Sequence, residues 1–131
     1  MSSSELQREL VGLLKAQATL VEGRVYDAPP PDAQMPYISL GPNYSTADEA
    51  ECSDGWVEVT QIDVWGSALP NRAQVKNIVN QVVRILRGHR IPEDGLIKAG
   101  PFRVTQFRVL SDPDPEIAHG VILFEVFIED G

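Results

Sequence analysis

The sequence predicts an α+β protein: a mostly antiparallel sheet of about four to five strands, with two helices packed on one face and long strands or hairpins extending from the core. Two segments, residues 2–21 and 70–88, have apolar residues at helical spacing. Three others, residues 56–66, 101–112 and 120–130, are rich in β-branched and aromatic residues. The order helix, short strand, strand, helix, strand, strand favours an antiparallel sheet with helices on one side. A chain of 131 residues fits one domain, residues 1–131.

The first helix and the segment after it open the chain. Leu6, Leu10, Leu13 and Leu14 form one apolar stripe, and Gly23 is a plausible end. The segment GRVYDAPPPDAQMPYISLG (residues 23–41) follows. Its three consecutive prolines restrict φ, which predicts a stiff, extended brace between the first helix and a short strand at 37–41. Residues 43–55 are polar and acidic and predict a mobile loop.

The long strands change the phase of their alternation midway. In residues 56–66, Val57 and Val59 share one face, whereas Ile62 and Val64 share the other. Residues 101–112 do the same between Val104 and Phe107. Such a change indicates a bulge, or a strand whose halves pack on different partners. The last strand, 120–130, is almost continuously apolar, which predicts burial on both faces.

The helix at 70–88 is the clearest element. Asn71 can cap its start and Gly88 its end. Its apolar face consists of Val75, Ile78, Val79, Val82, Ile85 and Leu86. The opposite face is basic and consists of Arg72, Lys76, Asn80, Arg84 and Arg87, so we expect it to point outward.

The residues of catalytic type do not form a recognisable active site. His89 follows a helix end and His119 precedes a strand, where structural roles are favoured over catalysis. Cys52 lies among acids, which raise a thiol pKa and disfavour a nucleophile. Paired carboxylates lie in polar loops, and the glycines are scattered singly rather than before a helix. We therefore expect no catalytic residues, cofactor or metal.

Charge and composition restrict the partners. The 11 basic and 19 acidic residues give a net charge of −8, which disfavours nucleic acid binding. The N-terminus is not a signal peptide, and no stretch approaches the ~20 apolar residues of a membrane span. One cysteine allows no internal disulfide. These features are typical of a soluble protein of the cytoplasm, without a membrane partner.

Two surfaces of opposite sign are the candidate contact sites. Acids gather in one polar segment, and the bases lie on the outer face of the second helix. They suggest head-to-tail contacts between copies, which close into a ring when the rotation permits. The same charges are equally typical of two solvated faces without a partner. The candidate interface residues are Asp48, Glu49, Glu51, Asp54, Arg72, Lys76, Arg84 and Arg87.

The ordered segments resemble a known family across essentially the whole chain. The shared pattern is the amphipathic first helix, GRVYDAPPPDAQMPYISLG, a strand ending in IDVWG (62–66), the helix NRAQVKNIVNQVVRILRG and a last strand opening HGVILFEV. This combination is similar to the tail-completion, or tail-terminator, proteins of long-tailed phages and gene transfer particles. The turn SDPDPEIAHG and the acids at 48–54 depart from that pattern.

The resemblance implies a non-enzymatic virion protein at the head-proximal end of the tail, assembled in the bacterial cytoplasm. Copies would form a ring, usually of six, that ends tube polymerisation. Its partners would be itself, the tail tube protein and the head-tail connector, and DNA would pass through without specific binding. A neck or head-completion subunit is the alternative. A domain that binds a small molecule near Tyr26 and Tyr37 belongs to a different class.

Overall fold

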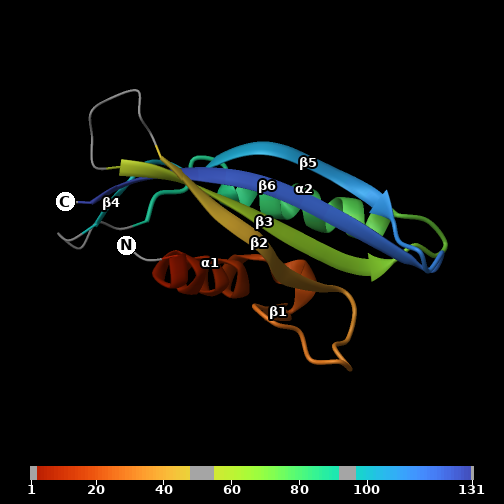
Figure 1. Ribbon diagram of the computed structural model, residues 1–131. Helices are drawn as coiled ribbons and strands as arrows, with labels where there is room; N and C mark the ends of the chain where they lie inside the picture. The colour runs from red at the N-terminus through yellow and green to blue at the C-terminus, as the bar shows by residue number, and fades with distance from the viewer. Residues whose placement is uncertain (1–2, 48–54, 92–96, 131) are drawn as a thin grey trace.

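The computed structural model describes residues 3–47, 55–91 and 97–130. The helices are α1 (Ser3–Gln17) and α2 (Ala73–Leu86), and a 3₁₀ turn, η1, spans Thr19–Val21. The strands are β1 (Val25–Tyr26), β2 (Tyr37–Ala47), β3 (Gly55–Ser67), β4 (Ile97–Ala99), β5 (Arg103–Ser111) and β6 (Ile117–Asp130). They form one sheet in the order β1-β2-β3-β6-β4, and β5 also pairs with β6 (Figure 1). Every pairing is antiparallel except β1 with β2. The predicted α+β class is confirmed.

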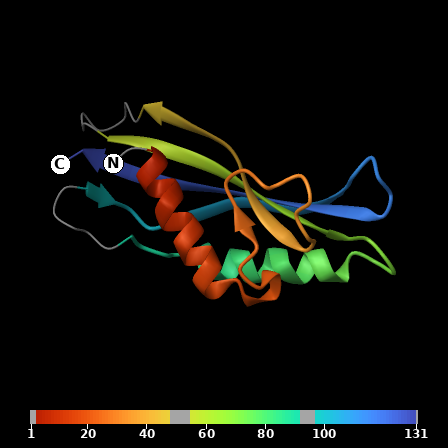
Figure 2. The same ribbon diagram turned by 90° about the horizontal axis from the view of Figure 1, so that it is seen from below.

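Both helices pack on the same face of the sheet. The residues of β3 and β6 that point to this face are even-numbered, and all are buried except half-buried Trp56; they include Ile62, Val64, Ala118, Ile122 and Phe124. Leu6, Leu10 and Leu14 of α1 meet them from one side, and α1 crosses in front of the strands when the molecule is seen from below (Figure 2). Within the described residues no helix covers the opposite face of the sheet, which we call the open face.

Two glycines let α2 approach the sheet closely. A Cβ added at Gly120 would lie 2.4 Å from Val79 Cγ2, and one added at Gly66 would lie 2.7 Å from Val75 Cγ2. The helix therefore packs its valines directly over the backbone of β3 and β6. The predicted apolar face is buried except for half-buried Ile85, and Val83 is buried as well. The caps lie one residue inside the predicted positions, at Arg72 and Arg87: Asn71, just before the N-cap, accepts from the Ala73 N–H at 2.9 Å through its Oδ1, and Gly88, just after the C-cap, has a φ of +74°. Neither helix in the described residues has the length and apolar character of a membrane span.

The phase change has a different cause in each long strand. In β5 it is a bulge: the register against β6 shifts between Val104 and Gln106, so Val104 and Phe107 lie on the same face. In β3 the first of the two predicted causes, a bulge, is excluded, because its register against β6 is unbroken from Gly55 to Ser67. The helix-side face of β3 continues through polar Glu58 and Thr60, while Val57 and Val59 lie on the open face.

Three further expectations need correction. Residues 43–47, predicted as loop, extend β2, whose own bulge lies between Leu40 and Asn43. β6 is not buried on both faces: Leu123 and Phe127 on the open face are only half-buried, because no helix covers that side. β1 and β4 were not predicted, since two and three residues are too short to show a periodicity.

The proline-rich segment is a clamped loop and not an extended brace. β1 runs parallel to the start of β2, so the chain between them must leave the sheet and return. A turn closes it, with the Ala33 N–H bonded to the Pro30 carbonyl at 3.0 Å. Its ends are held by Arg24 Nε, which donates to the Pro36 carbonyl at 2.8 Å, and by the rings of Tyr26 and Tyr37, which contact edge to face at 5.9 Å.

Candidate interaction surface

The two histidines have structural partners. His119 lies within β6, not before it, and its Nε2 is 2.7 Å from Asp63 Oδ1 of β3. Its ring stacks on Trp65 at 3.9 Å, and Trp65 Nε1 donates to Ser39 Oγ at 3.0 Å. The group therefore ties β2, β3 and β6 together on the open face. The ring of His89 packs against Phe102, and the backbone N–H of His89 donates to the Leu86 carbonyl at 3.0 Å.

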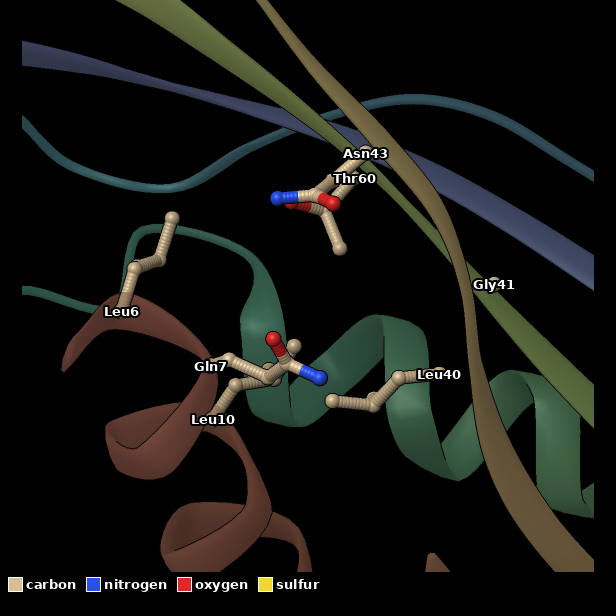
Figure 3. Close-up of a pocket in the computed structure, with 7 residues that line it drawn as sticks. All are labelled: Leu6, Gln7, Leu10, Leu40, Gly41, Asn43 and Thr60. Carbon is tan, nitrogen blue, oxygen red and sulfur yellow. The ribbon is translucent and has the colours of Figure 1, made fainter. Parts of the chain in front are cut away.

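A small cavity lies between α1 and the sheet. Leu6, Gln7 and Leu10 of α1 face Leu40, Asn43 and Thr60 across it, beside Gly41 (Figure 3). Its volume is about 10 Å³, which is the space of roughly one water molecule. Metabolite-sized ligands need pockets of ~300–1,000 Å³. This cavity therefore cannot hold such a ligand.

In the Tyr26 and Tyr37 region, our candidate pocket for a small molecule, the two rings contact each other edge to face. Burial raises the pKa of Tyr37, and the neighbouring Tyr26 phenol raises it further. Among the described residues no group of three or more His, Cys, Asp and Glu side chains is arranged to hold a metal ion. Neither the small cavity nor the Tyr26 and Tyr37 region therefore has the features of a catalytic or metal site.

A buried carboxylate forms the polar end of the core. Glu58 of β3 is 1% exposed, yet its side chain accepts hydrogen bonds from Asn43 Nδ2 at 3.0 Å, from Ser45 Oγ and from Trp56 Nε1 at 3.2 Å. Because several donors surround it, the carboxylate can stay buried. The donors come from β2 and β3, so Glu58 fixes the pairing of these strands.

The most distinctive surface feature is a groove between α2 and β5. Five basic residues and no acid lie along it: Arg72, Lys76, Arg84, Arg87 and Arg108. We call it the cationic groove. Phe107 of β5 lies at its centre and is 46% exposed, and Leu20 of η1, 48% exposed, lies at one end. Within the described residues none of the five cations forms an ion pair.

The structure tests only part of the predicted charge pattern. Arg72, Lys76, Arg84 and Arg87 are all exposed on one flank of α2, as the helical spacing predicts. Asp48, Glu49, Glu51 and Asp54 lie outside the described residues. Phe107 and Arg108 were not predicted as part of this surface. The phase change in β5 was the available signal, since a bulge there turns Phe107 toward the helix side.

Comparison with known proteins decides the family. A sequence profile described as tail completion protein gp17 matches residues 8–129. The chain belongs to this family. One curated relative, the tail completion protein gp17 of Bacillus phage SPP1, is 27% identical over 124 residues, covering 93% of this chain and 90% of its own.

Solved structures show the same fold. A chain in the virion of a native gene transfer agent particle superposes with a TM-score of 0.77 at 23% identity, over 92% of this chain and 91% of that one. The gp17 protein of bacteriophage SPP1 superposes with a TM-score of 0.58 at 24% identity, over 98% and 91%. The family predicted from the ordered segments is thus confirmed. A tail completion protein is a structural component of a tailed particle.

Proposed function

We propose that this tail completion protein forms a ring of six copies that caps the head-proximal end of the tail tube. The ring ends tube polymerisation and presents the surface on which the head connector docks, and it does so without catalysis. The observation that supports this most is the family match, which spans residues 8–129 and so covers nearly the whole chain.

The contact between copies is proposed to use the cationic groove. Arg72, Lys76, Arg84 and Arg87 would meet Asp48, Glu49, Glu51 and Asp54 of the neighbouring copy, head to tail. Five cations that lack an ion pair in the described chain support an acidic partner, because the molecule has an excess of acids over bases of 19 to 11.

The wall of the channel is proposed to be acidic. A charge of −8 per subunit, repeated around a ring, would repel phosphates and let DNA pass without adhering. A basic channel in the assembled ring would contradict this.

Deletion of the gene in the particle that encodes this protein tests the role. Without a terminator, tails should become longer than normal and remain unjoined to heads, and the wild-type gene supplied in trans should restore both. Electron microscopy of lysates measures both outcomes. Tails of normal length that fail only to join heads would instead indicate a neck subunit.

A further inference from the structure

The two long strands β2 and β5 each have a side that is largely unpaired, at opposite edges of the sheet. β5 pairs with β6 and with no other described strand. β2 pairs with β3 along its length, but β1 covers its outer side only at Ile38 and Ser39. No other described strand takes up the outer N–H and C=O groups of residues 40–47 and 103–111, although Pro42 has no N–H and interrupts the first row. Such a row is a template for another strand.

The directions of these edges fit each other. β2 is antiparallel to β3, β3 to β6, and β6 to β5, so β2 and β5 run in opposite directions. A second copy placed beside the first in the same orientation would bring its β2 antiparallel to β5. Each copy has one edge of each kind, so the contact repeats head to tail and can close a ring.

We propose that residues 40–47 of β2 in one copy add to β5 of the next copy, so that one sheet continues from subunit to subunit. This inference rests on the proposed ring and names the strands that build it. Main-chain hydrogen bonds would supply the contact, as in other cases of strand addition to a sheet edge.

The exposed aromatic side chains of the sheet lie on these two strands. Five large hydrophobic side chains are exposed among the described residues, and only Tyr44 (59%) and Phe107 (46%) lie on strands. Tyr44 is on β2 and pairs with Val59, so it points to the open face; Phe107 is on β5 and pairs with Ile122, so it points to the helix side. An added strand would cover one ring on each side of the joined sheet.

The charges agree with the same arrangement. Antiparallel pairing brings the Ala47 end of β2 to the Arg103 end of β5. That end adjoins the end of α2, because the Gly88 N–H bonds to the Phe102 carbonyl at 3.0 Å, and Arg84 and Arg87 belong to this part of the chain. The sequence continues from Ala47 into the acids that begin at Asp48.

Lysine variants of each edge test the inference. Tyr44→Lys and Phe107→Lys place a charge where the incoming strand would lie, which opposes strand addition. Each variant alone should lose the ring, measured by analytical ultracentrifugation of the isolated chain and by labelling of tails that lack this subunit. Leu69→Lys changes an equally exposed leucine outside the strands and should assemble like wild type. Unchanged thermal unfolding verifies that each variant is folded.

Mixing the two variants gives a sharper result. Each retains one intact edge, so an equimolar mixture should form dimers and nothing larger. Amide hydrogen exchange of the wild type should also slow at residues 40–47 and 103–111 on assembly. Rings formed by either lysine variant, or assembly without slower exchange at these edges, would overturn the edge pairing alone. If amide exchange at these edges slows only when tube protein is added, the edge pairing is overturned too, because the tube protein and not a second copy would then cover the edges. A wild-type chain that assembles neither alone nor on tails would refute the ring itself.

Discussion

Glu58 shows how a single residue can mislead a prediction based on hydrophobic alternation. Val57 and Val59 look like the core side of their strand, yet they lie on the open face, and the buried position between them is a glutamate. The prediction from alternation fails because it infers burial from hydrophobicity, whereas the buried side chain here is polar. A carboxylate with several donors around it can be buried at acceptable cost, and its donors Asn43 and Ser45 lie in a segment that reads as loop.

Replacing this carboxylate by an amide should weaken the fold. In Glu58→Gln one of the two side-chain oxygens becomes an NH₂ group that faces the donors of Asn43, Ser45 and Trp56. We expect a loss of about 1–3 kcal/mol in the free energy of unfolding, measured by urea denaturation with an unchanged m-value. Glu9→Gln, at an exposed position of α1, should change it by less than ~0.5 kcal/mol. Equal effects of the two substitutions would mean that the buried hydrogen bonds contribute little.

At the scale of elements, predictability followed periodicity and length. α2 was predicted with its approximate ends and its two faces, because fourteen residues give a clear helical pattern. The outer half of β2 was missed because an edge strand whose side chains are exposed on both faces has no apolar alternation. The path of the proline segment was not predicted, since the parallel pairing of β1 with β2 forces the chain to turn back.

The basic face of α2 allows a test by charge reversal. Lys76→Glu with Arg84→Glu should weaken assembly, because like charges would then face the acids at 48–54 of the neighbour. Exposed pairs contribute only ~0.2–1 kcal/mol each, so the double variant is needed for a measurable shift in sedimentation. Lys15→Glu, at an exposed position on α1, is the matched control and should have no effect.

Reversal of the partner acids completes this test. Asp48, Glu49, Glu51 and Asp54 changed to Lys should restore the assembly of the double variant. Assembly that is unaffected by the double variant, or a defect that the acid reversal leaves in place, would contradict the proposed pairing.

For the whole molecule, the sequence could predict which charges are exposed but not where they meet. The cationic groove exists because β5 lies beside α2, and that neighbour relation depends on β6 pairing with β3 and β5 together. Likewise, the two unpaired edges are properties of strand order. No local pattern encodes strand order, which is why the candidate surface was only half predicted.

The net charge leads to a prediction for the assembled particle. Purified assemblies should not retain duplex DNA even at low salt, where electrostatic attraction is least screened. A gel-shift or fluorescence anisotropy titration measures this, with the chain in which Asp48, Glu49, Glu51 and Asp54 are changed to Lys as the comparison. Salt-sensitive DNA binding by wild-type assemblies would contradict the acidic channel.

The clamped proline loop also makes this chain amenable to engineering. The contacts at Arg24, Tyr26, Pro36 and Tyr37 fix the two ends of the loop independently of its middle, where Pro30 to Asp32 are exposed. Doubling the length of a flexible loop costs only ~0.6 kcal/mol in closure entropy. An epitope or a small fluorescent label inserted there would allow this subunit to be detected in single particles, while the core beneath the loop stays unchanged.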